Sequence, residues 1–426
     1  MSLVITPPMR DARAREIAAG FDLRALPADF YANPYPVYAA LRAAEPVRRM
    51  PDGSYFLTRY DDLVTVYRDA QTFSSDKKVE FAPKYGDSPL FEHHTTSLVF
   101  NDPPLHTRVR KLIMGALTRR AIAEMEPGLV TLVDGLLDAI EAKGGGDLIE
   151  DFASAIPVEI IGNLLGVPHA DRGPLRDWSL AILGALEPKL TPEQEAAGNR
   201  SVTEMLAYLR ELVRERRAHP GDPAHDVLTR LIQGESGGET LSETELLQNC
   251  IFILNAGHET TTNLIGNALV ALQEWPDAKA GLLQKTERLT QDPSGLEAVL
   301  TLAVDEFLRF ESSNQLGNRR ALRACEVGGV ALEAGALVTL CIGAANRDPA
   351  QFARPDVLDL AREDNRHLAF GFGIHQCAGL SLARLEGRIA IGRFLARFPH
   401  YQLTASPTRG GRARFRGFLR APFRVA

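Results

Sequence analysis

A 3.6-residue apolar period recurs along the chain from Ala121 onward and limits it to a largely helical fold. This period predicts helices over Glu124–Ala142, Val202–Arg217, Ser242–Trp275, Ser294–Phe310 and Leu380–Phe398. The stretch that starts at Ser242 opens with Ser-Glu-Thr-Glu, which fits a capping box. Alternating or glycine-punctuated segments predict short strands over Val47–Met50, Ser54–Thr58, Cys325–Cys341 and Tyr401–Val425. We therefore expect a mainly α fold with small β-sheets.

Length and composition restrict the class of protein further. The chain has 426 residues, of which 45% are hydrophobic and 24% charged, so a disordered or fibrous chain is excluded. It carries no proline-rich or serine-rich linker, and we expect one domain over residues 1–426 with an N-terminal extension over 1–30. A net charge of −6 does not favour nucleic acid. The absence of a signal-peptide core or membrane span and the four cysteines predict a soluble, cytoplasmic protein without disulfides.

The run Phe370-Gly-Phe-Gly-Ile-His-Gln-Cys-Ala-Gly379 carries the strongest chemical signal. Its three glycines let the backbone adopt positive φ angles and approach something large and flat. Cys377 directly precedes a predicted helix, whose N-terminal dipole favours a thiolate. This thiol is therefore a nucleophile or a metal ligand. A buried structural cysteine and a hydrolase that pairs it with His375 remain alternatives, whereas the other cysteines are too dispersed for a zinc site.

A second polar run, Ala256-Gly-His-Glu-Thr-Thr261, lies in the middle of the longest predicted helix. Glycine costs about 1 kcal/mol there relative to alanine. Threonine hydroxyls can bond back to the preceding turn and bend a helix. Together with an acid, these residues could open a groove and hold water. The alternative is a surface acid beside a helix-weakening pair.

These two runs resemble the haem-binding loop and the oxygen-activation motif of the cytochrome P450 haem-thiolate monooxygenases. The resemblance implies a single P450-like domain that encloses haem b (iron protoporphyrin IX), with Cys377 as the axial thiolate to its iron. Such a thiolate donates electron density that favours O–O cleavage. The resemblance also implies that Phe370 and Ala256 contact the haem, that Thr260 assists oxygen activation by hydrogen bonding, and that Glu259 relays protons.

The same resemblance assigns cations to the two haem propionates. The segment from Asp102 onward, Asp-Pro-Pro-Leu-His-Thr-Arg-Val-Arg, is similar to the family's C-helix segment. It implies that His106, Arg110, Arg319 and His375 contact the propionates, with Arg319 preferred to its neighbour Arg320.

Glu306 and Arg309 resemble the family's Glu-x-x-Arg motif, which implies a buried structural ion pair. A third cation often follows there in a Pro-x-(Arg/His) segment. This chain has Pro355-Asp-Val357 at that place, which predicts that the third member is absent or replaced.

For the substrate pocket, the resemblance implies contacts from Leu98, Ile253, Ser313 and Asn314. The segment Glu311-Ser-Ser-Asn-Gln315 is polar where apolar residues are frequent, so we hypothesise a small substrate with a polar anchor at Ser313 or Asn314.

Electrons must come from a separate protein, because the chain has neither a dinucleotide-binding glycine motif nor an iron–sulfur cysteine cluster. The resemblance implies NAD(P)H as the source, acting through a ferredoxin reductase and a ferredoxin. The ferredoxin would dock on the cysteine side, on Arg108, Lys111, Arg119 and Arg120. We expect a monomer, with no membrane partner, that uses O2 to hydroxylate or oxidatively dealkylate its substrate. A peroxide-driven peroxygenase and a non-enzymatic haem sensor remain alternatives.

Overall fold

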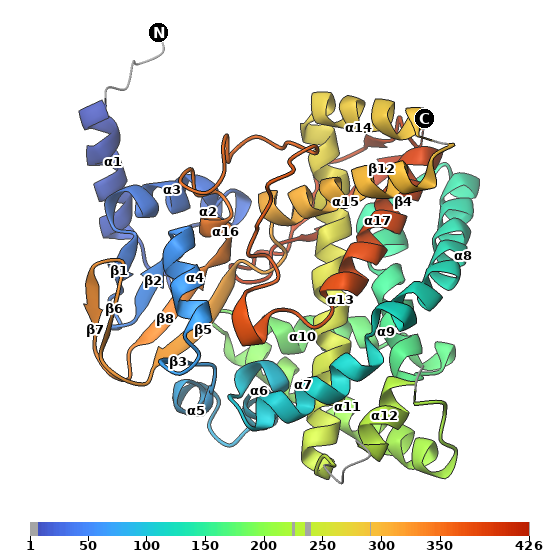
Figure 1. Ribbon diagram of the computed structural model, residues 1–426, viewed down its shortest axis with the longest axis horizontal. Helices are drawn as coiled ribbons and strands as arrows, with labels where there is room; N and C mark the ends of the chain where they lie inside the picture. The colour runs from blue at the N-terminus through green and yellow to red at the C-terminus, as the bar shows by residue number, and fades with distance from the viewer. Residues whose placement is uncertain (1–6, 224–225, 235–239, 290, 426) are drawn as a thin grey trace.

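The computed structural model describes residues 7–223, 226–234, 240–289 and 291–425, and the described chain is mainly helical, as predicted (Figure 1). The helices are α1 (Pro7–Gly20), α2 (Ala28–Ala32), α3 (Tyr35–Ala44), α4 (Tyr60–Arg68), α5 (Lys78–Tyr85), α6 (Pro89–Thr96), α7 (Leu105–Ala116), α8 (Arg119–Lys143), α9 (Ala155–Leu165), α10 (Leu175–Gly184), α11 (Pro192–Ala218), α12 (Val227–Gln233), α13 (Glu243–Glu274), α14 (Pro276–Arg288), α15 (Pro293–Phe310), α16 (Ile342–Ala345) and α17 (Leu380–Arg397). Short turns of tighter or wider helix are η1 (Leu98–Phe100), η2 (Leu148–Ala153), η3 (His169–Asp171) and η4 (Gly373–His375).

The strands form small sheets. They are β1 (Val47–Arg49), β2 (Tyr55–Leu57), β3 (Phe73–Ser74), β4 (Gly145–Asp147), β5 (Leu316–Ala321), β6 (Cys325–Val327), β7 (Val330–Leu332), β8 (Leu337–Cys341), β9 (Gln402–Leu403), β10 (Thr408–Arg409), β11 (Phe418–Arg420) and β12 (Pro422–Arg424). The largest sheet has the order β1-β2-β8-β5-β3, so strands from the two ends of the chain lie side by side. The pairs β6–β7 and β10–β11 and the sheet β4-β12-β9 complete the β structure of the described residues.

Helix α13 runs through the helical part of the molecule, with the largest sheet to one side (Figure 1). It begins where predicted, because Ser242 and Glu245 form a reciprocal capping box. Helices α9, α10, α11 and α17 pack around it. The part of α13 after Thr260 is buried on all sides up to Leu272, which a helix tolerates only in the centre of a large core. Helix α13 therefore forms the axis of the main core.

The predicted N-terminal extension is partly integrated into the fold. Helix α1 packs on α3, and Ala18, Phe21 and Phe30 are buried in one cluster with Phe56 of β2. Its described residues therefore cover the outer face of the largest sheet, whereas residues 1–6 of the extension lie outside the described part.

Two helices begin earlier than predicted, because the residues that open them are exposed and polar: Arg119 and Arg120 in α8, and Glu193 and Gln194 in α11. Helix α8 starts at Arg119, where the Thr118 side chain caps the Ala121 amide, and α11 starts at Pro192 with a Thr191–Gln194 capping box. An apolar period cannot detect turns that face water. The strand β5 was not predicted, because its sequence Leu-Gly-Asn-Arg-Arg-Ala lacks strand formers and depends on pairing with β8. In the described part of the chain, no helix is long and apolar enough to cross a bilayer.

Candidate functional site

The cysteine loop is held in a conformation that requires its glycines. Gly371 and Gly373 have φ angles of 65° and 72°. A β-carbon on Gly373 would lie 2.4 Å from the carbonyl oxygen of Tyr67 in α4, so only glycine fits there. The main-chain N–H of Cys377 donates to the Phe370 carbonyl at 2.9 Å, and α17 begins three residues later. The loop therefore fixes the thiol at the start of a helix.

One face of α13 borders space that protein atoms do not fill. Partly exposed residues recur along this face at helical spacing, and the positions between them are buried. The partly exposed residues are Phe252, Ile253, Ala256, Gly257 and Thr260. In the loop, Phe370, Cys377 and Ala378 are also partly exposed. Ile253, Ala256 and Thr260, which the sequence predicted as pocket or haem contacts, thus share one face of α13.

The cations predicted at the edge of this site gather in one cluster. The rings of His106 and His375 lie 4.1 Å apart between centroids. Both ring nitrogens of His106 and Nε2 of His375 are buried without a hydrogen-bond partner among the described residues. Burial, followed by the charges of Arg319, His106 and Arg110, lowers the pKa of His375 to about 2. The Asp102 carboxylate acts on His106 and Arg319 by charge, but its hydrogen bonds go to Ser74 and Ser75.

Two carboxylates at this position would satisfy the orphaned imidazoles and compensate the guanidinium charges. Arg319 fits this arrangement better than Arg320, because its charge acts on both His106 and His375. Burial also raises the pKa of the Cys377 thiol, whereas the Gly379 amide and the charges of Arg110 and Arg384 lower it. A bound metal cation would favour the thiolate and so reverse the effect of burial. The residues present thus fit a large, flat, dianionic group with a metal at its centre, as haem is.

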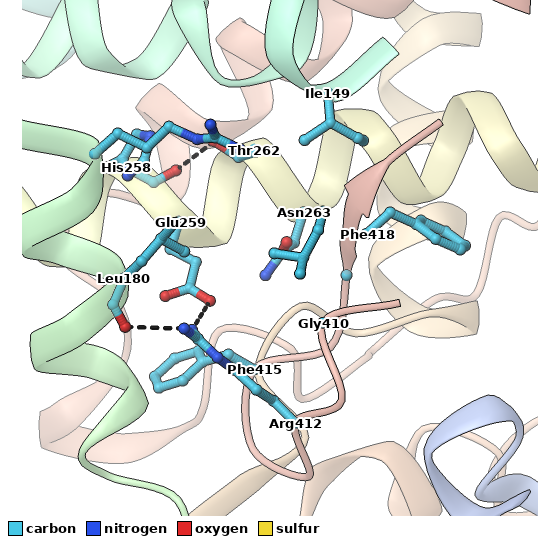
Figure 2. A pocket seen from close by; sticks show the side chains of 13 residues that line it. Ile149, Leu180, His258, Glu259, Thr262, Asn263, Gly410, Arg412, Phe415 and Phe418 are labelled. Carbon is cyan, nitrogen blue, oxygen red and sulfur yellow. Dashed lines mark hydrogen bonds and ion pairs between the residues drawn. The ribbon is translucent and has the colours of Figure 1, made fainter. Parts of the chain in front are cut away.

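The two predicted catalytic residues lie on different sides of α13. Thr260 faces the partly open side and its Oγ1 donates to the Ala256 carbonyl at 2.8 Å. Glu259 is buried on the other side, where Arg412 Nη1 donates to its Oε1 at 2.5 Å (Figure 2). The second arm of Arg412 donates to the Leu180 carbonyl of α10 at 2.9 Å. Burial raises the pKa of Glu259 to about 7, and Arg412 opposes that rise.

A small cavity lies beside this ion pair, between α13, α10 and the C-terminal turns (Figure 2). Its volume of about 20 Å³ accommodates one water molecule. Three of the residues that line it have buried polar atoms without a hydrogen-bond partner among the described residues. These atoms are Glu259 Oε2, both ring nitrogens of His258 and Asn263 Nδ2. No sequence pattern pointed to Arg412, because it reaches Glu259 from a turn far along the chain.

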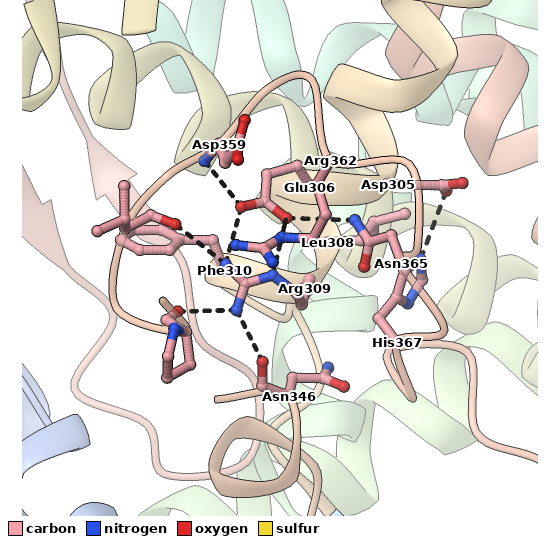
Figure 3. A network of polar contacts seen from close by, with 12 residues as sticks. Asp305, Glu306, Leu308, Arg309, Phe310, Asn346, Asp359, Arg362, Asn365 and His367 are labelled. Atoms are coloured by element: carbon pink, nitrogen blue, oxygen red, sulfur yellow. Dashed lines mark hydrogen bonds and ion pairs between the residues drawn. The ribbon is translucent and has the colours of Figure 1, made fainter. Parts of the chain in front are cut away.

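Glu306 and Arg309 form the predicted buried pair, with two bonds of 2.7 and 2.8 Å between guanidinium and carboxylate (Figure 3). Of the two possibilities for the third member, absent or replaced, the structure shows a replacement. Arg362 donates its Nε to Glu306 Oε2 at 3.0 Å. It lies seven residues after Pro355, outside the expected segment, whose Pro355 and Val357 carbonyls accept bonds from Arg309 instead.

The predicted substrate residues have different surroundings. Leu98 is buried in η1, and its main-chain N–H donates to Asn249 Oδ1 at 2.9 Å. Ser313 Oγ donates to the Thr260 carbonyl at 2.8 Å, and Asn314 Oδ1 accepts from the Leu316 amide at 3.4 Å. Both side chains thus have main-chain partners, which removes the reason to treat them as a free polar anchor. Their contact with a substrate stays a prediction.

The predicted docking cations lie in α7 and at the start of α8. Arg108 forms an ion pair with Glu245 at the start of α13, and Arg120 pairs with Glu124 at 2.8 Å. Lys111 and Arg119 are exposed. Since α7 also carries His106 and Arg110, Lys111 lies close to the cation cluster in the chain.

Comparison with known proteins identifies the family. The cytochrome P450 family model matches residues 185–414. Cytochrome P450 107B1 from Saccharopolyspora erythraea is 37% identical over 400 residues, covering 91% of this chain and 93% of that protein. The vitamin D(3) 25-hydroxylase of Pseudonocardia autotrophica is 38% identical over 378 residues, with 88% of each chain covered.

A similar solved structure is that of P450BioI in complex with hexadec-9Z-enoic acid-ligated acyl carrier protein, with a TM-score of 0.85 and 32% identity. The match covers 94% of this chain and all of that one. The chain therefore belongs to the cytochrome P450 family and is an oxidoreductase of the monooxygenase type.

Proposed function

We propose that this enzyme inserts one oxygen atom from O2 into a C–H bond of a small organic substrate, or removes an alkyl group by oxidation, with haem b held by Cys377. The observation that carries the proposal is the position of this thiol. It lies on a glycine-shaped loop beside a cation cluster in which three buried imidazole nitrogens have no hydrogen-bond partner among the described residues, in a fold whose central helix has one partly exposed face.

The bound haem supplies the redox chemistry that activates O2. Cys377 ligates its iron as a thiolate. His106, Arg110, Arg319 and His375 hold the propionates by charge and hydrogen bonding. Phe370 of the cysteine loop and the small Ala256 of α13 would contact the bound group. Glu306, Arg309 and Arg362 stabilise the segment that leads into the cysteine loop.

Glu259 and Thr260 are proposed to move protons. A carboxyl with a pKa of about 7 exchanges protons readily near neutral pH, which suits a general acid–base group. The adjacent cavity can supply a water as its proton source. On the other side of the helix, the Thr260 hydroxyl can exchange its bond to the Ala256 carbonyl for one to a group in the pocket. This pair also favours O2 over peroxide as the oxidant.

We propose further that a ferredoxin and its reductase deliver electrons from NAD(P)H in the cytoplasm, and that the enzyme acts as a monomer. The ferredoxin would dock beside the cysteine loop, where Lys111 of α7 is exposed. No nucleic acid or membrane takes part in this scheme.

The test is the carbon monoxide difference spectrum of the reduced enzyme. The wild-type protein is expected to give the thiolate-type band, and Cys377→Ala is expected to lose it. The control Cys325→Ala changes a partly exposed thiol of β6 and should retain it. A thiolate-type band that survives in Cys377→Ala would refute the ligand assignment. Turnover with peroxide alone, at rates that match the full electron-transfer chain, would favour a peroxygenase.

A further inference from the structure

Asp305 of α15 accepts hydrogen bonds from two segments that adjoin the cysteine loop. Arg384 of α17 donates its Nε to Asp305 Oδ1 at 2.7 Å. His367 Nε2 lies 3.4 Å from the same oxygen, a contact that can be followed in Figure 3. Burial would raise the pKa of Asp305, but the bonds from His367 and Arg384 hold it below the ordinary value. The carboxylate therefore stays ionised at neutral pH.

The proton on His367 is assigned by its second contact. Its Nδ1 accepts from the Ala369 main-chain N–H at 3.2 Å, so Nε2 must carry the proton that it shares with Asp305. The His367 side chain is 2% exposed. The Phe370 carbonyl in turn accepts from the Cys377 N–H at 2.9 Å. Asp305 is thus connected to Cys377 through hydrogen bonds and one turn of loop backbone.

Arg384 gives a second connection, which is electrostatic. The guanidinium carbon of Arg384 lies 5.0 Å from the centre of the Phe370 ring. The centre of the His367 ring lies 5.7 Å from the centre of the same phenylalanine ring. Both side chains that Asp305 binds therefore contact the phenylalanine at the start of the cysteine loop. The charge of Arg384 also lowers the pKa of the Cys377 thiol, against the larger effect of burial. The position of this guanidinium, and its pairing with Asp305, therefore affect the electrostatic potential at the Cys377 sulfur.

We propose that Asp305 is a positioning residue that sets the electrostatic potential at Cys377, by holding Arg384 and His367 against Phe370. The inference rests on the proposed ligation of haem by Cys377. Charge and hydrogen bonding around a thiolate ligand tune the reduction potential of the iron that it binds. Loss of the Asp305 charge makes the potential at the site more positive. That change favours the reduced state, which carries one more electron.

The test compares reduction potentials of haem-loaded variants. Asp305→Asn keeps the size of the side chain and an acceptor oxygen but removes the charge, and Asp305→Ala also removes the two bonds. The matched control is Asp134→Asn, because Asp134 of α8 binds Arg393 of the same helix α17 through two bonds of 2.5 Å. Arg393 lies nine residues after Arg384, roughly 13 Å further along the helix.

We expect a positive shift of the haem reduction potential in Asp305→Asn and none in Asp134→Asn. Asp305→Ala should in addition lose part of the thiolate-type band of the carbon monoxide complex, because the loop is no longer held. Should Asp305→Ala fail to bind haem, Asp305→Asn still carries the test. A potential in Asp305→Asn equal to that of the wild type would overturn the proposal. Failure of the proposed function differs, because the wild-type protein itself would then lack the thiolate-type band.

Discussion

Two threonines of α13, two residues apart in the sequence, make the same kind of hydrogen bond but face different sides of the helix. Thr260 Oγ1 donates to the Ala256 carbonyl at 2.8 Å, and Thr262 Oγ1 donates to the His258 carbonyl at 3.1 Å. The hydrogen bonds are of the same type, yet Thr260 is partly exposed and Thr262 is buried beside the small cavity. Only Thr260 shares the face of Ala256 and Ile253.

This difference predicts distinct outcomes for the two alanine variants. Thr260→Ala should still bind haem but should release reduced oxygen as hydrogen peroxide, with product formation lower by on the order of 10²-fold. Thr262→Ala loses the hydrogen bond from Thr262 to the His258 carbonyl. This variant should still convert NAD(P)H consumption into product as the wild type does. The measurements are product and peroxide formed per NAD(P)H consumed. Full coupling in Thr260→Ala would mean that its hydroxyl has no part in proton transfer.

Arg412 limits the pKa of Glu259, which burial raises. Because Arg412 opposes the rise caused by burial, Arg412→Gln should move the pKa of Glu259 above its present value of about 7. The raised folded-state pKa makes the buried carboxyl favourable to folding at low pH, and this contribution is lost as the pH rises through that value. The loss begins near the unfolded-state pKa of 4.5 in both proteins and should extend to higher pH in the variant.

Infrared titration of the protonated carboxyl band can measure this shift, with the band assigned by its absence in Glu259→Gln. The control is Arg420→Gln in β11, because Arg420 is exposed and pairs with Glu150 instead. An Arg412→Gln titration that coincides with the wild type would show that Arg412 does not act on Glu259.

At the scale of elements, a buried network of ion pairs and hydrogen bonds connects α15 to residues 346–362, which precede the cysteine loop. Glu306 and Arg309 are fully buried on one turn of α15. Arg309 donates to the carbonyls of Asn346 and Pro355, and Arg362 brings a second guanidinium to Glu306. A buried carboxylate between two guanidinium groups stabilises the fold only when its hydrogen bonds are satisfied. Removal of one guanidinium therefore lowers the free energy of unfolding.

Arg362→Ala is therefore expected to lower the free energy of unfolding by about 3 kcal/mol. The matched control is Arg354→Ala, since Arg354 lies in the same segment and pairs with Asp359, but its side chain is 69% exposed. Breaking that pair should cost less than about 1 kcal/mol. Chemical denaturation of both variants gives the comparison, and equal losses would show that the contact of Arg362 with Glu306 is unimportant.

At the scale of the whole molecule, a net charge of −6 coexists with basic residues around α7. The exposed Lys111 lies next to Arg110, and Arg108 of the same helix pairs with Glu245 at the start of α13. The charge that a redox partner meets is therefore local, and the total charge does not describe it.

Lys111→Glu should slow reduction by a ferredoxin, most strongly at low salt, and leave chemical reduction unchanged. Lys285→Glu is the control, because Lys285 belongs to α14, which follows the opposite end of α13, about 48 Å along its axis. Stopped-flow reduction at two ionic strengths measures the effect. Equal rates for both variants and the wild type would place the docking surface elsewhere.

Much of the fold followed from local patterns. The helix that begins at Ser242, the strands β1 and β2 and the helix after Cys377 were all predicted, because periodicity and capping act within one segment. The strand β5 and the polar first turns of α8 and α11 were not. The strand depends on a partner strand, and the helix starts consist of exposed polar residues that leave no apolar period.

The sequence by itself determined the local chemistry of this protein: a cysteine fixed by glycines at a helix start, and a threonine and an acid adjacent on one helix. Neighbours in sequence have their relative geometry set by the backbone, so motifs of this kind can be recognised before any fold is known. Only the tertiary structure decided which distant groups meet them. Arg412 beside Glu259, Arg362 beside Glu306 and Arg384 beside Asp305 come together through packing of segments far apart in the chain.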